Sequence, residues 1–188
     1  MPNLVNPPIV VCGVSRGGTS MVAGLLRVMG VNMGENIGLL NHEDLDVVSK
    51  TGSEFVEYVT QRSLQNLSGK WGFKYPHLHD FYQECISLLG QCKLIFIFRD
   101  HFSVALSYKK YHDIPLSIGV REAARRYALL SSMFCELQSS TLPLSYEKAI
   151  QNKSKCVKDI SDYIGIELSD QKHRECIDFI SPGAYRKI

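Results

Sequence analysis

A glycine-rich turn between a β-forming stretch and an apolar stretch constrains this chain most. Residues 9–12 read Ile-Val-Val-Cys, glycine follows at position 13, and an apolar segment runs from residue 21 to residue 29. A strand, a glycine-rich turn and a helix in this order form a cradle for phosphate, because backbone N–H groups point outward there and the helix dipole favours an anion. The sequence therefore predicts an anion-binding turn at residues 13–20.

The glycine spacing in this turn is that of a Walker A loop, with one departure. Gly13 and Gly18 are separated by four residues, but Thr19 stands where a Walker A loop has its lysine. A nucleotide kinase uses that lysine to reach the transferred phosphate, so Thr19 argues against kinase chemistry. Arg16 is the only cation within residues 13–20.

Alternating strand and helix patterns predict an α/β fold. The continuous apolar run at residues 93–98 is typical of a strand buried on both faces of a parallel sheet. We expect a three-layer α/β/α architecture with a mainly parallel, P-loop NTPase-like sheet, in one domain spanning residues 1–188. The expected strands are residues 9–12, 71–74, 93–98 and 142–145, and the main expected helices are about 21–29, 53–67, 80–89, 102–111, 118–137, 154–164 and 169–179.

Composition narrows the class of protein. Hydrophobic residues make up 45% of the chain, charged residues 21%, and the net charge is +2, which is ordinary for a soluble protein and gives no basis for binding nucleic acid. The six cysteines contain no Cys-x-x-Cys pair, which favours reduced thiols, and no metal-ligand spacing is seen. With no signal-peptide pattern and no membrane-spanning run, we expect a cytoplasmic protein.

Three cations follow the expected strands. Arg16 comes after the first strand, Lys74 ends the second and Arg99 follows the third. The carboxyl ends of parallel strands share one edge of a sheet, where ligands bind in open α/β folds. We therefore expect these cations on one rim, facing a ligand with several negative charges.

Two stretches resemble the sulfotransferases that use 3′-phosphoadenosine 5′-phosphosulfate (PAPS). The loop Ser15-Arg16-Gly17-Gly18-Thr19-Ser20 is similar to the first family loop, Pro-Arg/Lys-Ser-Gly-Thr-Thr/Ser. The apolar strand ending in Arg99-Asp100, with Ser107 eight residues after the arginine, is similar to the second signature, although His101 replaces the usual proline. The resemblance implies that the loop binds the 5′ end of the nucleotide and that Arg99 and Ser107 bind its 3′-phosphate.

The resemblance continues outside these two signatures. Leu144-Ser145-Tyr146-Glu147 resembles a family strand ending in Tyr-Glu, which implies that Tyr146 helps to hold the nucleotide. Residues 71–77 resemble the bacterial Trp-Gly-x-Lys-Asp-Pro-Arg stretch, with Tyr75 in place of aspartate and His77 in place of arginine. Residues 181–187 stand where the family has a C-terminal basic motif.

Sulfuryl transfer requires a base for the acceptor hydroxyl and donors for the charge on the leaving group. Arg16, Lys74 and the loop N–H groups are expected to stabilise that charge. The resemblance implies a base that is either a glutamate some way past the loop cation or a histidine shortly after the strand lysine. Glu43 fits the first position, with Glu35 also possible, and His77 lies one residue beyond the second.

The function implied by the resemblance is sulfuryl transfer from PAPS, without a metal, to a small-molecule or glycan hydroxyl. A P-loop phosphotransferase of nucleotide-kinase type and a non-catalytic nucleotide-binding protein are the alternatives. Specificity for the acceptor is expected to lie in loops such as residues 31–52 and 109–117. The acceptor itself and the oligomeric state cannot be read from the sequence.

Overall fold

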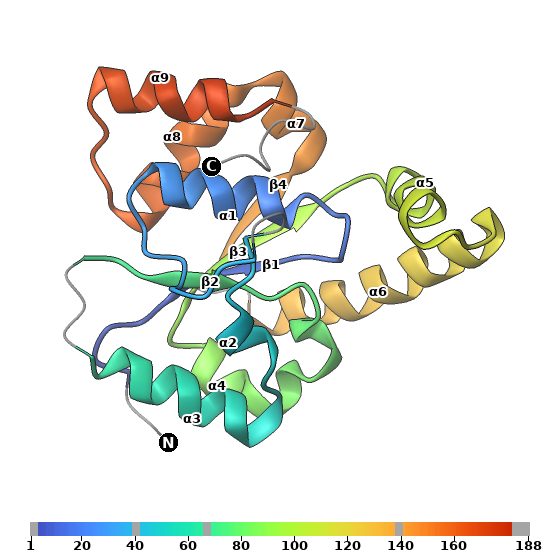
Figure 1. The fold of residues 1–188 in the computed structure, drawn as a ribbon, viewed down its shortest axis with the longest axis horizontal. Helices are drawn as coiled ribbons and strands as arrows, with labels where there is room; N and C mark the ends of the chain where they lie inside the picture. Colours follow the sequence, from blue (N-terminus) through green and yellow to red (C-terminus); the bar gives the residue numbers. More distant parts are fainter. Residues whose placement is uncertain (1–3, 39–41, 66–68, 138–140, 182–188) are drawn as a thin grey trace.

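The structure, a computed structural model, describes residues 4–38, 42–65, 69–137 and 141–181 (Figure 1). Its centre is a four-stranded sheet in the order β2-β1-β3-β4. The strands are β1 (Ile9–Cys12), β2 (Gly72–Lys74), β3 (Lys93–Phe98) and β4 (Thr141–Ser145). Every pairing in this sheet is parallel, which confirms the predicted α/β fold and the position of each expected strand to within one residue.

Helices cover both faces of the sheet (Figure 1). On one face lie α1 (Thr19–Val28), α7 (Tyr146–Gln151), α8 (Lys153–Ile164) and α9 (Asp170–Phe179). On the other lie α2 (Leu45–Val48), α3 (Gly52–Ser63), α4 (Ile86–Leu89) and α6 (Leu116–Leu137). None of the helices in these described ranges is both long and apolar enough to cross a membrane.

Alternation along the strands separates the core into two halves. Val10 of β1 packs with Phe96 of β3 in the cluster under α3 and α6, whereas Val11 and Ile95 pack in the cluster under α1 and α8. All four side chains are fully buried. Successive strand residues point to opposite faces, so a run of apolar residues is needed to fill both halves.

Helix α5 (His101–His112) begins where β3 ends and packs against α6, so that the two helices extend beyond the sheet (Figure 1). Asp100 caps α5 by accepting a hydrogen bond from the backbone N–H of Ser103 at 2.7 Å. An aspartate at this position satisfies a backbone donor that the helix itself leaves unpaired. This cap fixes the start of α5 two residues after Arg99.

The prediction of a single helix at residues 80–89 is wrong. The chain instead forms two 3₁₀ turns, η1 (Leu78–Asp80) and η2 (Tyr82–Cys85), and only the last turn, α4, is α-helical. Between the turns Phe81 has φ −140°, outside the helical region, and its ring packs edge-on against Phe55 and Tyr75. This aromatic packing outweighs the local helical pattern.

Other boundaries also differ from expectation. α1 begins at Thr19, before the apolar segment, and α7 follows β4 directly where no helix was expected. α3 ends at Ser63, and residues 66 and 67 of the helix expected there lie outside the described residues. The expected C-terminal basic motif at residues 181–187 lies outside them too, except for Ser181.

Candidate functional site

The glycine-rich turn connects β1 to α1, and at two of its positions only glycine fits. A Cβ atom at Gly13 would lie 2.7 Å from the Thr19 Cγ2 atom and 2.9 Å from the Ile97 Cγ2 atom. Gly18, the N-cap of α1, has φ +99°, and a Cβ atom there would collide with the ring of Tyr146. Both glycines are therefore required for the close approach and the left-handed turn that bring the backbone to the helix N-terminus.

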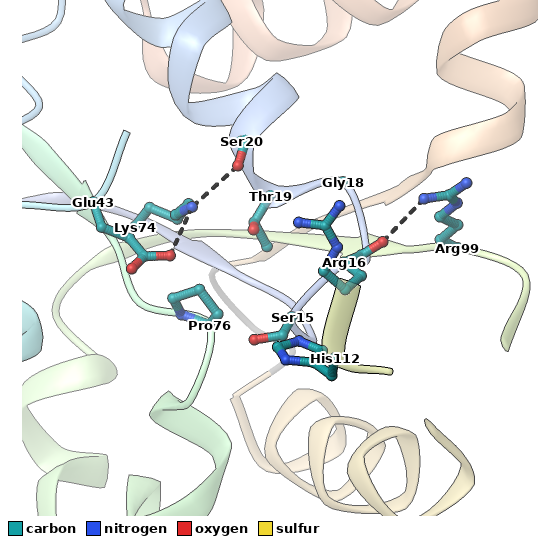
Figure 2. A pocket seen from close by; sticks show the side chains of 10 residues that line it. All are labelled: Ser15, Arg16, Gly18, Thr19, Ser20, Glu43, Lys74, Pro76, Arg99 and His112. Atoms are coloured by element: carbon teal, nitrogen blue, oxygen red, sulfur yellow. Dashed lines mark hydrogen bonds and ion pairs between the residues drawn. The ribbon is translucent and has the colours of Figure 1, made fainter. Parts of the chain in front are cut away.

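A cavity of about 230 Å³ opens at this turn (Figure 2). Three cationic side chains and one carboxylate face it, together with the N-terminus of α1, whose first turn contains no acidic residue. The residues that line it are Ser15, Arg16, Gly18, Thr19, Ser20, Glu43, Lys74, Pro76, Arg99 and His112. Cations and a helix N-terminus at one cavity make it suited to an anion.

Lys74 enters the cavity from the end of β2. Its side chain is only 2% exposed, and its Nζ donates to the Ser20 hydroxyl at 3.2 Å and lies 2.9 Å from Glu43 Oε1 (Figure 2). β2 is the neighbour of β1, so a lysine at its carboxyl end reaches the first turn of α1. This chain therefore brings a lysine to the loop from an adjacent strand, although Thr19 occupies the lysine position within the loop.

Arg16 has a left-handed backbone conformation, with φ +65°. This conformation is uncommon for a non-glycine residue and needs support from its surroundings. Arg16 Nε donates to the Ser107 hydroxyl at 2.9 Å, and the guanidinium carbon lies 3.8 Å from the centre of the Tyr111 ring. Two residues of α5, Ser107 and Tyr111, thus hold the Arg16 side chain.

Arg99 supports the same loop from the end of β3. Its Nη1 donates to the backbone carbonyl of Arg16 at 3.0 Å, on the side of the loop opposite Lys74 (Figure 2). Its guanidinium carbon lies 4.7 Å from the centre of the Tyr146 ring. The Arg99 backbone N–H donates to the Tyr127 hydroxyl of α6 at 2.9 Å, which fixes the end of the strand.

His77 lies beside Ser15, with 3.3 Å between the His77 Nε2 and the Ser15 Oγ. Its Nδ1 lies 2.7 Å from Nη1 of Arg126 on α6. Burial lowers the pKa of His77 below its usual value, and the neighbouring Arg126 guanidinium lowers it further. Asp80, whose Oδ2 lies 3.6 Å from Nδ1, opposes this shift, but the net direction favours the neutral imidazole.

The structure brings most of the predicted site residues together. Ser15, Arg16, Gly18, Thr19, Ser20, Glu43, Lys74 and Arg99 line one cavity. Ser107, Tyr146 and His77 do not line it, but each contacts a residue that does: Arg16, Gly18 and Ser15 respectively. Gly17 lies within the turn, where its N–H donates to the Val14 carbonyl, and Glu35 is exposed away from the cavity lining.

Some residues at the site carry no signal in the sequence. His112 lines the cavity, Tyr111 lies against Arg16, and Arg126 contacts His77. These three residues follow no motif, and their positions depend on how α5 and α6 pack. Within the described ranges, no group of three or more His, Cys, Asp or Glu side chains is placed to hold a metal ion.

Comparison with known proteins finds similarity in structure and none in sequence. No protein-family model and no curated protein matches the chain. Mouse sulfotransferase SULT7A1, solved in complex with PAP, has a TM-score of 0.61 at 13% identity, covering 98% of this chain and 67% of that one. The sulfotransferase domain of the Synechococcus PCC 7002 olefin synthase has a TM-score of 0.63 at 15% identity, covering 89% and 76%.

Retinol dehydratase, solved in complex with retinol and PAP, is also similar, with a TM-score of 0.55 at 14% identity over 98% of this chain and 68% of that one. These three matches cover between 89% and 98% of this chain. The three proteins share a fold with this chain at identities too low for a sequence search to find. The chain has the fold of the sulfotransferases.

Proposed function

We propose that this protein transfers the sulfuryl group of PAPS to the hydroxyl of a small-molecule or glycan acceptor. The observation that carries the proposal is the cavity at the β1–α1 turn, where Arg16, Lys74 and Arg99 surround a helix N-terminus. The likeness to SULT7A1 and retinol dehydratase, both solved with PAP, supports the same donor. Most residues of the first loop signature, together with Arg99 of the second signature, line this cavity.

The cavity residues fit the anionic end of such a nucleotide. Its volume of about 230 Å³ is below the roughly 300–1,000 Å³ of pockets that enclose a drug-sized ligand, so it suits the phosphosulfate rather than the whole nucleotide. The loop from Ser15 to Ser20 would hold the 5′ end. Arg99 and Ser107 would hold the 3′-phosphate, with Tyr146 beside Arg99.

Two cations are suited to the charge that develops during transfer. PAPS supplies an activated sulfuryl group whose loss leaves negative charge on the 5′-phosphate. Lys74 and Arg16 are fixed at the loop before any ligand arrives, and donors held in place need no reorganisation as charge builds. The N-terminus of α1 adds a favourable dipole.

Glu43 is the better candidate for the base. Its carboxylate lines the cavity, 23% exposed, and the 2.9 Å contact with Lys74 holds it there. His77 is less suitable because Arg126 can only donate, so His77 Nδ1 accepts and the neutral ring carries its hydrogen on Nε2, facing Ser15. Neither ring nitrogen is then open to take a proton from an acceptor.

A kinase remains the less favoured alternative. Lys74 reaches Ser20 from β2, but the loop position that carries the Walker lysine holds Thr19. The loop itself therefore lacks the cation that such a kinase places on the transferred phosphate.

Replacing Arg99 with alanine should weaken binding of PAP. The variant loses a charge-assisted hydrogen bond, so we expect a loss of about 1.5–3 kcal/mol in binding free energy by calorimetry. Arg121→Ala, which removes an exposed cation from α6, is the control and should bind normally. Wild-type affinity in Arg99→Ala would remove this residue from the proposed phosphate site.

Glu43→Gln keeps the shape of the side chain and removes the proton acceptor. We expect kcat for sulfuryl transfer to fall by roughly 10²–10⁴-fold while PAP still binds. Release of PAP from PAPS in the presence of an acceptor measures the rate, and Glu35→Gln is the matched control. Near-normal turnover in Glu43→Gln would show that another residue is the base.

His77 should titrate below the ordinary histidine pKa of about 6.5. Removing the neighbouring cation in Arg126→Gln stabilises the imidazolium, so the pKa of His77 should rise. NMR titration of the His77 ring measures both values. Arg125→Gln is the control because it removes the neighbouring arginine, which donates to Glu122, and leaves the Arg126–His77 contact in place. An unchanged pKa in Arg126→Gln would contradict the assigned contact and with it the argument against His77 as base.

A further inference from the structure

The two residues that flank Glu43 in the sequence are buried, and each contacts a different helix. His42 and Asp44 are both 1% exposed, whereas the Glu43 side chain between them is 23% exposed and faces the cavity at the β1–α1 turn (Figure 2). His42 contacts Arg27 of α1, and Asp44 contacts Arg62 of α3. Since Glu43 itself contacts the end of β2, three consecutive side chains are held by three separate elements.

His42 connects this segment to the helix that begins at the anion-binding turn. Its backbone is left-handed, with φ +56°, which is uncommon for a non-glycine residue and needs support from its surroundings. Arg27 Nη1 lies 3.0 Å from His42 Nδ1, and because a guanidinium can only donate, Nδ1 accepts. The ring lies beside Gly24, where a Cβ atom would be 3.2 Å from His42 Nε2. His42 is therefore fixed relative to α1.

Asp44 is fixed on the other side of Glu43. Its Oδ1 accepts a hydrogen bond from the Asp46 backbone N–H at 3.1 Å and so caps α2. Its Oδ2 lies 3.4 Å from Nη1 of Arg62, which also donates to the Tyr58 hydroxyl at 2.8 Å. A Cβ atom at Gly34 would collide with the Asp44 carboxylate, so the surrounding chain encloses this side chain.

The ion pair of Asp44 with Arg62 is a costly way to hold the chain. Arg62 is 7% exposed, and its Nε and Nη2 have no hydrogen-bond partner among the described residues. Burial raises the pKa of Asp44 above its ordinary value, even though the Asp46 N–H and Arg62 oppose this shift. Buried ion pairs often add no stability over apolar residues of similar volume. Stability alone therefore does not explain this pair.

Backbone hydrogen bonds transmit these contacts to Glu43. The Gly38 N–H donates to the Glu43 carbonyl at 2.9 Å, and the Leu45 N–H donates to the Asn36 carbonyl at 2.9 Å. The backbone on both sides of Glu43 is thus paired with residues 36–38. With its two neighbours and its own carbonyl held, the position of the Glu43 backbone is set.

We propose that His42 and Asp44 are positioning residues that fix the Glu43 carboxylate at the cavity. They act through Arg27 and Arg62, and none of these four residues lines the cavity. A base must lie within hydrogen-bond reach of the proton that it takes, and a displacement of about 1 Å can lower the rate roughly 10²-fold. This inference rests on the proposed function, in which Glu43 is the base.

Arg27→Met tests the contact on the α1 side, because it removes the hydrogen bond and leaves the His42 backbone unchanged. We expect kcat to fall about 10–100-fold, whereas calorimetry should find unchanged affinity for PAP. Lys158→Met is the matched control, since it removes an exposed cation that pairs with Asp162 on α8. It should leave both values unchanged.

A measurement without turnover separates this inference from the proposed function. The ¹⁵N NMR signal of the Lys74 ammonium reports its contact with Glu43 in the ligand-free protein. Burial shields this ammonium from solvent, which distinguishes its signal from those of exposed lysines. In Arg27→Met the signal should shift toward its position in Glu43→Gln, and in Lys158→Met it should not move.

A conservative variant of His42 provides a rescue. Asparagine tolerates a left-handed backbone, and its Oδ1 can accept a hydrogen bond as the imidazole nitrogen does. His42→Asn should therefore keep most of kcat, whereas His42→Ala, which has no acceptor for Arg27, should lose as much as Arg27→Met.

A double variant tests the contact on the α3 side. Asp44→Asn keeps a residue that can cap α2 but leaves the charge of Arg62 buried without its partner, so the unfolding temperature should fall. Asp44→Asn combined with Arg62→Met removes that charge and should restore the unfolding temperature, whereas kcat should stay low. A purely structural role predicts that stability and kcat recover together.

The outcomes separate the two proposals. Lower kcat with unchanged PAP affinity and a shifted Lys74 signal supports the positioning role. If the wild-type protein sulfates no acceptor, the shifted signal still supports that role while sulfuryl transfer fails. An unchanged signal in Arg27→Met, PAP affinity that falls with kcat, a His42→Asn variant as slow as His42→Ala, or recovery of kcat in the double variant would overturn the positioning role. Wild-type kcat in Arg27→Met would overturn it while upholding sulfuryl transfer.

Discussion

The site depends on the burial of one cation, Lys74. An ammonium group that is only 2% exposed is unfavourable unless it is paired, and here Glu43 and Ser20 provide the partners. The three residues come from β2, from the segment before α2 and from the first turn of α1. Their contacts therefore fix the segment that carries Glu43 relative to the β1–α1 turn. Glu43, the candidate base, is held beside the candidate anion site.

The opposite side of the loop is fixed by a second set of contacts. Arg16 has an unfavourable left-handed backbone, and Arg99 and Ser107 hold its carbonyl and its guanidinium respectively. The Ser107 oxygen already accepts a hydrogen bond from Arg16. The hydroxyl hydrogen of Ser107 can therefore donate to an incoming phosphate. The loop, β3 and α5 thus form one connected set of donors, arranged before the ligand binds.

The fold and part of the site could be predicted from local patterns. The apolar run of β3, the glycine-rich turn and the cations at the strand ends all follow from neighbouring residues and from the parallel sheet. The contact of His77 with Arg126 could not be predicted, because it joins segments far apart in sequence. The prediction of a helix at residues 80–89 was wrong for the same reason: it could not include the distant contact of Phe81 with Phe55 of α3.

Calorimetry with two nucleotides tests the proposed donor site most directly. PAP and 5′-AMP differ only in the 3′-phosphate that Arg99 and Ser107 are proposed to hold, so the comparison isolates these contacts in the unmodified protein. In buffer containing EDTA, PAP should bind at least about tenfold more tightly, equivalent to the 1.4 kcal/mol of one charge-assisted hydrogen bond. Equal affinities for PAP and 5′-AMP, or binding of PAP only when magnesium is added, would contradict the proposed site.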